Sequence, residues 1–334
     1  MTRSRALTVG GVVGRVGHKV SGFIDVPAAE HPATTIPVTV VTGMREGPVL
    51  ALVAGIHGSE PSPIVALQRV RAELDPESLA GTVILVHVAN LPSFSHRTIY
   101  RGPFDQKNLN RAFPGRPDGT GSECIAHAIT TQVIDQCDYL IDMHSGDGNE
   151  ALRPYSYWNW LGVDDAVDNT ARELALAFGL DHIVIDRGRP RERQATLYCS
   201  NTAHVRGKPA VTTEVGAEGI PTEAMVECNV RGAFRVMRYL SMVPGPREMV
   251  EHPVWLEPAE VLWSPGTGTW HPAVRPDQYV MKGAVLGRLT NYFGDLIAEV
   301  RSPLDGVVLY LVTSPAMGEG EPIGMVGLPR SAWD

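Results

Sequence analysis

A buried strand that leads into a histidine-bearing loop and then a helix is the feature of this sequence that most constrains its fold. Residues 49–54 form a continuous apolar run, which is typical of a central strand covered on both faces. The run leads into Gly55-Ile56-His57-Gly58-Ser59-Glu60-Pro61, and residues 62–74 then carry apolar side chains at helical spacing. This unit predicts an α/β domain with polar side chains directly after a buried strand.

The same alternation of strands and helices continues to about residue 240. Further strands are predicted at 82–89, 139–143, 182–186 and 209–213, and further helices at 122–136, 166–178 and 226–240. This order predicts a domain over residues 1–245 with a mainly parallel sheet flanked by helices. Sites in such sheets form at the carboxyl ends of strands. His57, His144 and Glu214 each follow a predicted strand, so we expect them to lie at one edge.

The last quarter of the chain has a different pattern. Residues 244–258 are rich in proline and predict a linker. The following region, residues 259–334, consists of short β-like runs separated by glycines, which predicts a smaller all-β domain of barrel or sandwich form. Its runs at 279–289 and 302–308 resemble the biotinyl/lipoyl hammerhead fold. The turn between them, Phe293-Gly294-Asp295, has no lysine, which argues against a carrier function.

Charge, hydropathy and cysteine content exclude several functional classes. The formal net charge of -8 offers no basic footprint for nucleic acid. The apolar runs at 49–56 and 82–89 are too short for the ~20 residues of a membrane-spanning helix. The four cysteines lack a C-x-x-C spacing, so neither a disulfide scaffold nor a thiolate zinc site is predicted. We therefore expect a cytoplasmic protein with no nucleic-acid or membrane partner.

The loop after the first buried strand carries a candidate metal site. Catalytic zinc usually takes three protein ligands from histidine and carboxylate groups and keeps one position for water. His57 and Glu60 supply two such ligands on a tight glycine-containing loop. A lone H-x-x-E pair also arises by chance, and His144 is the best candidate for the third ligand. Asp142 either orients a ligand imidazole or makes a purely structural hydrogen bond.

Four ordered motifs identify a family resemblance over roughly residues 35–327. The motifs are Gly55-Ile56-His57-Gly58-Ser59-Glu60, Asn108-Leu109-Asn110-Arg111-Ala112-Phe113-Pro114-Gly115, Asp142-Met143-His144-Ser145 and Thr213-Glu214-Val215-Gly216. In this order they resemble the succinylglutamate desuccinylase/aspartoacylase family, which belongs with the zinc carboxypeptidases. The resemblance implies a zinc-carboxypeptidase-like fold, with Zn²⁺ on His57, Glu60 and His144.

The resemblance also implies roles for other residues. Glu214 would be the general base that activates the zinc-bound water, and Asn110 and Arg111 would anchor a substrate carboxylate. Asn108 stands where the family usually has aspartate, and Arg101 is the nearest upstream arginine for the oxyanion. The alternatives are a loop salt bridge for Arg111 and a structural strand-end carboxylate for Glu214.

Chemistry and position together define the candidate reaction. Zinc lowers the pKa of bound water towards ~7 and polarises an amide carbonyl, and a neighbouring carboxylate can move the proton to the leaving amine. Glu214 suits that task, while Arg153 and Tyr155 are additional candidates for substrate contacts because they follow His144 near the same edge.

Three functions are compatible with these residues. The first is hydrolysis of a small N-acylated amino acid or related amine, and the second is zinc metallocarboxypeptidase action on peptides. A C-terminal domain that closes over the site would favour the first, and an open groove would favour the second. The third, a non-catalytic binding protein, is opposed by the complete set of metal and base residues. The sequence leaves the acyl group, the amine half and homo-oligomerisation open.

Overall fold

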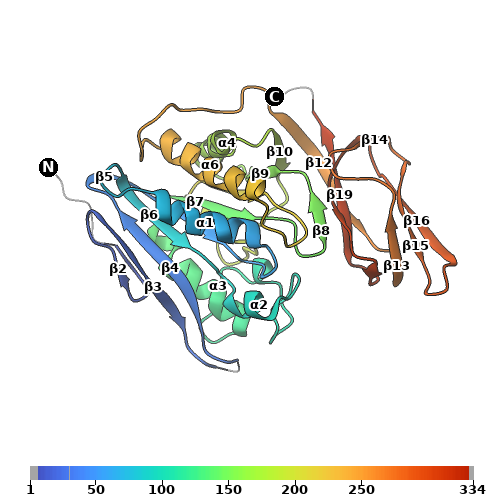
Figure 1. Cartoon of the computed structure of the whole chain (residues 1–334), viewed down its shortest axis with the longest axis horizontal. Coiled ribbons are helices and arrows are strands. Elements are labelled where there is room, and N and C mark those ends of the chain that lie inside the picture. The colour runs from blue at the N-terminus through green and yellow to red at the C-terminus, as the bar shows by residue number, and fades with distance from the viewer. Residues whose placement is uncertain (1–6, 30, 331–334) are drawn as a thin grey trace.

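The computed structural model describes residues 7–29 and 31–330. A long mixed sheet runs through the molecule (Figure 1). The main path of this 13-stranded sheet runs, in spatial order, through β14 (Tyr279–Val280), β17 (Gly306–Val312), β19 (Pro322–Pro329), β12 (Val254–Trp263), β10 (His182–Asp186), β9 (Tyr155–Asn159), β11 (Ala210–Glu214), β7 (Tyr139–His144), β5 (Arg45–Ala54), β6 (Ala80–Val86), β4 (Thr34–Thr42) and β3 (His18–Val26). Off this path, β8 (Glu150–Leu152) pairs with β17. A separate hairpin joins β1 (Thr8–Val9) to β2 (Val12–Val13).

The middle of the sheet is mainly parallel. Strand β5 runs parallel to both β6 and β7, and β7 runs parallel to β11. Strand β9 is antiparallel to β11 and parallel to β10. The register of β7 and β11 sets Glu214 opposite His144, at the carboxyl ends of both strands. The expected α/β class with flanking helices is confirmed, and the sheet as a whole is mixed.

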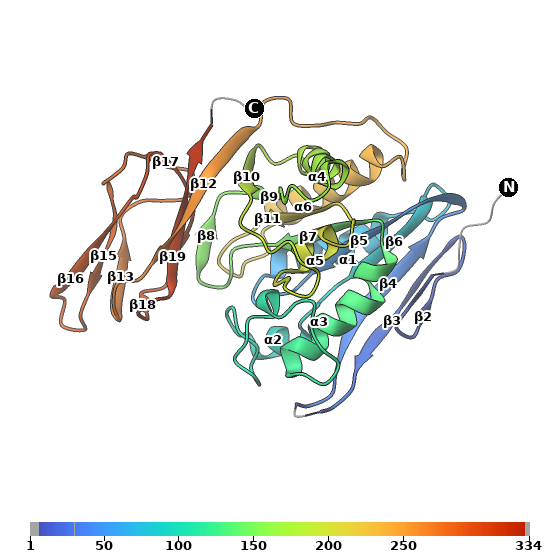
Figure 2. The ribbon, with the colours of Figure 1, turned by 180° about the vertical axis from the view of Figure 1, so that it is seen from behind.

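Helices cover both faces of this central sheet. Helices α1 (Pro61–Glu73), α4 (Asp165–Phe178) and α6 (Glu223–Tyr239) lie on one face (Figure 1) and share one hydrophobic core. Helices α3 (Gly121–Gln132) and α5 (Cys199–His204) lie on the other (Figure 2), over a second core. The short elements are α2 (Leu91–His96), η1 (Leu109–Arg111) and η2 (Ile134–Gln136). Within the described ranges, no helix combines the length and apolar character needed to cross a membrane.

The C-terminal region continues the sheet and adds another. A four-stranded antiparallel sheet has the order β16 (Leu296–Arg301), β15 (Val285–Thr290), β13 (Gly268–Pro272) and β18 (Ala316–Met317). A hydrophobic cluster with Leu262 and Val308 from the long sheet and Trp270 and Leu286 from this one joins the two. This region lies at one end of the molecule (Figures 1 and 2).

The predicted linker at 244–258 is wrong in its last five residues. Residues 254–258 belong to β12, which pairs in parallel with β10 and antiparallel with β19. These neighbours satisfy the strand's backbone groups, which outweighs the local proline signal. The long sheet therefore runs without a break from the α/β part into the C-terminal region.

Candidate metal centre and active-site cavity

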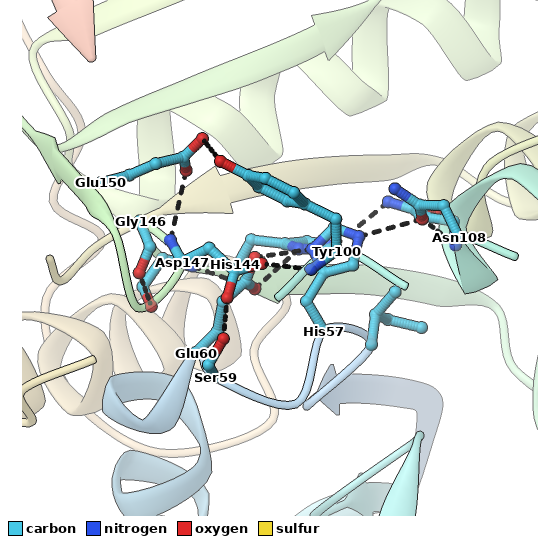
Figure 3. Close-up of polar contacts among 12 residues, drawn as sticks. His57, Ser59, Glu60, Tyr100, Asn108, His144, Gly146, Asp147 and Glu150 are labelled. Atoms are coloured by element: carbon cyan, nitrogen blue, oxygen red, sulfur yellow. Dashed lines mark hydrogen bonds and ion pairs between the residues drawn. The ribbon is translucent and has the colours of Figure 1, made fainter. Parts of the chain in front are cut away.

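His57, Glu60 and His144 converge at the carboxyl ends of β5 and β7 (Figure 3). The Nδ1 atom of His57 lies 2.6 Å from Oε1 of Glu60, and Nδ1 of His144 lies 2.9 Å from Oε2 of the same carboxylate. One donor atom from each residue lies within 4.8 Å of the other two. The structure thus brings the three expected ligands together, although 84 residues separate Glu60 from His144.

The local backbone explains how the loop brings His57 and Glu60 together. Gly55 has a φ of 72°, a conformation that glycine adopts without steric cost. A Cβ atom at Gly58 would lie 2.2 Å from the carbonyl carbon of Ser93, so the loop can pack directly on α2 only with glycine there. Glu60 then occupies the N-cap of α1, and Pro61 begins the helix, where a missing N–H is tolerated.

The outer nitrogen of each histidine meets a different partner. Nε2 of His57 lies 3.0 Å from the side-chain oxygen of Asn108, and Nε2 of His144 lies 3.2 Å from Oδ1 of Asp142. These two oxygens can hold the imidazole rings in place, and the side-chain nitrogen of Asn110 also lies 3.3 Å from Nε2 of His144. This geometry favours the orienting alternative for Asp142, which is fully buried.

The donor set fits a catalytic zinc ion. Two imidazole nitrogens and one carboxylate are a known ligand set of catalytic zinc. Burial favours the neutral form of Glu60, but the charges and hydrogen bonds of His144 and His57 outweigh it and lower the pKa of Glu60 to about 2. A carboxylate that stays ionised between two imidazoles is suited to holding a cation.

Glu214 ends β11 beside this cluster and lines the adjoining cavity. Burial raises its pKa well above the usual range, and the negative charges of Glu60 and Glu150 add to that effect, whereas His144 opposes it. Within the described part of the chain, Glu214 makes no salt bridge or hydrogen bond through its side chain. This disfavours a purely structural role.

The cavity beside the cluster has a volume of about 570 Å³ and lies between the α/β part and the C-terminal region. The α/β part contributes the candidate ligands His57 and Glu60, together with Glu214, Arg101, Arg111 and Tyr155. The C-terminal region contributes Val261, Trp263, Tyr310, Gly320, Glu321 and Pro322. The sheet's continuation beyond β10 therefore supplies one wall of the cavity.

Two expected substrate-binding residues lie elsewhere. Asn110 is buried, and its side-chain oxygen accepts a hydrogen bond of 2.9 Å from the backbone N–H of Cys199. Arg153 points to Asp181 and Asp277, at 2.7 and 2.8 Å, because these two carboxylates attract its guanidinium. Neither side chain lines the cavity. The side-chain nitrogen of Asn110 lies 3.3 Å from Nε2 of the candidate ligand His144, and Arg153 connects the α/β part with the C-terminal region.

Arg111 lines the cavity as expected, but its setting includes residues that no motif indicated. Its guanidinium carbon lies 4.3 Å from the ring centre of Tyr198, and that of Arg189 lies 3.4 Å from the same centre. Cation–π contacts of this kind hold an arginine in place. Arg189 belongs to an arginine-rich segment whose local charge was visible in the sequence, but its position on Tyr198 depends on the fold.

Comparison with known proteins identifies the family. A profile described as the succinylglutamate desuccinylase/aspartoacylase catalytic domain matches residues 46–240, which is more than half of the chain. The chain belongs to this family. The resemblance inferred from the four motifs is therefore confirmed, and it supports the expectation of an amidohydrolase or deacylase enzyme.

Relatives in the family match almost the whole chain. The N-alpha-acetyl-L-2,4-diaminobutyric acid deacetylase of Halomonas elongata is 30% identical over 318 residues, which cover 91% of this chain and 90% of the relative. The product-bound ectoine utilization protein EutE (DoeB) of Ruegeria pomeroyi is 27% identical, with a TM-score of 0.82 and coverage of 93% and 95%. A succinylglutamate desuccinylase from Silicibacter sp. TM1040 is 25% identical, with a TM-score of 0.81, and the match covers 93% of this chain and 95% of that structure. The C-terminal region is thus shared with these structures.

Proposed function

We propose that this protein is a zinc-dependent deacylase that hydrolyses the amide bond of a small N-acylated amino acid or related amine. The observation that carries this proposal is the convergence of His57, Glu60 and His144 beside Glu214 in one cavity. The deacetylase relative, whose name specifies an N-acetylated amino acid, supports this substrate class.

The protein's own groups would divide the work of hydrolysis. Zinc, when bound, supplies a Lewis acid and a water of lowered pKa. Glu214 would accept the water proton on its carboxylate and return it to the nitrogen of the leaving amine, a task that its raised pKa suits. Asn108 and Asp142 would help to hold the two imidazoles in the orientation that ligation requires.

Two arginines would stabilise the negative charges of the oxyanion and of the substrate carboxylate. Arg101 lines the cavity and would donate to the oxyanion that develops on the carbonyl. Arg111 would bind a substrate carboxylate, for which a planar guanidinium is well matched. The Nη1 atom of Arg111 donates to the backbone oxygen of Asn110 at 2.8 Å. This contact holds the guanidinium in place, and its other N–H groups would bind the substrate.

The peptide alternative shares the same chemistry but needs a different cavity. A metallocarboxypeptidase must admit a chain that extends away from the site, whereas Trp263, Glu321 and Pro322 wall this cavity from the C-terminal region. We therefore propose that residues 259–330 act as a structural domain that restricts the site to small amides.

A substrate screen tests the proposal. Zinc-loaded full-length protein would be offered N-acetyl, N-succinyl and N-formyl amino acids and diamines, and release of free amine would be measured. We expect turnover of at least one N-acyl class and its loss in the matched Glu214→Gln variant. Cleavage of only C-terminal peptide bonds in a parallel peptide panel would support the carboxypeptidase alternative instead.

A further inference from the structure

The cavity has groups of opposite charge on the two sides of the candidate metal ligands. Figure 3 shows Glu150 and Asn108 on opposite sides of His57, Glu60 and His144. Asn108 is the N-cap of η1 and Arg111 is its last residue, so the backbone of Arg111 lies on the Asn108 side of the site. Glu150 and Arg111 both line the cavity. A substrate that carries both a carboxylate and a cationic group would match this arrangement.

Glu150 is held in a defined position at the start of β8. One of its oxygens accepts a hydrogen bond of 2.7 Å from the hydroxyl of Tyr100, and the other accepts one of 3.2 Å from the backbone N–H of Asp147 (Figure 3). Tyr100 is itself fixed, because its backbone N–H donates to Asp147 at 2.9 Å. The carboxylate is therefore preorganised and has little rotational freedom to lose on binding a ligand.

Glu150 lacks a positive partner in the part of the chain that the structure describes. It forms no ion pair with a described lysine, arginine or histidine, and the charges that act on it most strongly, Asp147 and Glu60, are negative. Burial, the largest cause, and these charges raise its pKa to about 7. Glu150 is half-buried. A carboxylate that is partly withdrawn from solvent without a counter-charge is costly, and a ligand cation would reduce that cost.

We propose that Glu150 is a specificity-determining residue that binds an alkylammonium group on the amine half of the substrate. The preferred substrates would then be N-acylated diamino acids, with the carboxylate at Arg111, the amide beside Glu214 and the free ammonium at Glu150. This inference rests on the proposed deacylase function and assigns it a substrate class and a recognition residue.

Glu321 is the rival carboxylate on the cavity wall. It comes from the C-terminal region, lies on the exposed surface and accepts a hydrogen bond of 2.8 Å from the backbone N–H of Gly318. Solvent screens an ion pair at such a position more strongly than one at the half-buried Glu150. Glu150 is therefore the better candidate, and Glu321→Gln provides a matched variant at the rival site.

Two substrates that differ only in charge test the assignment. Nα-acetyl-2,4-diaminobutyrate ends in an ammonium, and Nα-acetylnorvaline replaces that group with a methyl. The ratio of their kcat/KM values would be measured with zinc-loaded full-length protein, because this ratio does not depend on the active fraction of a preparation. We expect the wild-type protein to prefer the diamino substrate and Glu150→Gln to reduce the preference about 10- to 100-fold.

Two further variants separate recognition from support. Tyr100→Phe removes the hydroxyl next to Glu150 but keeps the carboxylate, so the preference should stay within about threefold of wild type. Glu321→Gln should have an equally small effect on this ratio. A ratio unchanged in Glu150→Gln, or one that falls as much in either of the other variants, would overturn the assignment.

A binding experiment distinguishes failure of the deacylase proposal from failure of the Glu150 proposal. If the wild-type protein hydrolyses neither substrate, calorimetry would compare binding of the products 2,4-diaminobutyrate and norvaline. Tighter binding of the diamino acid that is lost in Glu150→Gln would support the recognition site even though the deacylase proposal had failed. Equal binding of the two products by wild-type protein would overturn the recognition site as well.

Discussion

Within residues 7–29 and 31–330, two buried clusters pair histidine with carboxylate, and the one with the candidate metal ligands borders the active-site cavity. In the first, Nε2 of His204 in α5 lies 2.6 Å from Oδ1 of Asp168 in α4. Asp168 also accepts hydrogen bonds from the backbone N–H groups of Leu161 and Gly162, at 3.1 and 2.7 Å. The second cluster is Glu60 between His57 and His144.

The difference lies in what the carboxylate oxygens meet. Both oxygens of Asp168 receive hydrogen bonds from protein donors, which closes the pair and secures the contact between α4 and α5. Each oxygen of Glu60 instead contacts an Nδ1 atom that can ligate a metal, and one of them also accepts a hydrogen bond of 3.3 Å from the backbone N–H of Ser145. Burial of a histidine beside an acid is thus insufficient to indicate a site; three converging donors and an adjoining cavity are needed.

The largest effect on activity is expected when a ligand is removed from the second cluster. His57→Ala should reduce zinc from about one ion per chain to near zero and turnover by more than about 10³-fold, because zinc contributes several kcal/mol to the transition state. Elemental analysis of purified protein and an amine-release assay would measure both. Retention of zinc in His57→Ala would contradict the ligand assignment.

Removal of the proposed base should separate metal binding from turnover. Glu214→Gln should keep its zinc and lose about 10²- to 10⁴-fold in kcat, the usual contribution of a general base. Burial raises the pKa of Glu214, so the active, ionised form is lost as pH falls through that raised value. In the wild-type protein, kcat/KM should therefore fall at acidic pH. The residual activity of Glu214→Gln should lack this fall, and an identical fall in the variant would show that Glu214 is not the group that causes it.

A substitution at Asp142 tests whether its contact with Nε2 of His144 serves metal binding, or only stability like the Asp168–His204 pair. Asp142→Asn keeps the shape of the side chain but removes its charge, and it should weaken zinc affinity about 10- to 100-fold through the orientation and basicity of His144. Competition with a chelator of known affinity would measure this. An unchanged affinity combined with a lower unfolding temperature would make Asp142 structural, like Asp168.

The smallest effect on activity is expected when the Asp168–His204 pair is removed. Asp168→Ala should destabilise the fold by about 3 kcal/mol, because it leaves buried donors unpaired, while turnover per folded molecule should stay unchanged. Burial opposes ionisation of Asp168, but the hydrogen bonds from His204 and the two backbone N–H groups lower its pKa. Its stabilising effect is thus complete above the unfolded pKa of about 3.9 and is lost as pH falls towards the lower folded value.

Unfolding of wild type and Asp168→Ala at pH 7 and at pH 3 would measure that contribution. The difference in unfolding free energy should be smaller at pH 3. A large loss of kcat in the folded variant would show that the two clusters are not functionally distinct.

The sequence by itself determined the scaffold and the candidate metal ligands. Continuous apolar runs at 49–54 and 139–143 are strong local signals, and a residue that directly follows a parallel strand has its position set by the sheet. His57, His144 and Glu214 could therefore be assigned to one edge although they lie far apart in the chain. The motif order then identified the family.

The tertiary structure alone decided which side chains complete the cavity. Tyr100, Glu150 and Tyr198 lie outside the strand-end motifs, and loop packing together with the pairing of β8 and β17 brings them to the cavity wall. Arg153 was expected near the substrate because it follows His144 in sequence, yet two carboxylates from other elements hold it elsewhere.

The continuation of the sheet through β12 also depends on pairing with strands distant in sequence. Strand-end positions follow from periodicity within one short segment. Charge pairing, ring stacking and cavity walls depend on distances between segments, which only the folded chain fixes.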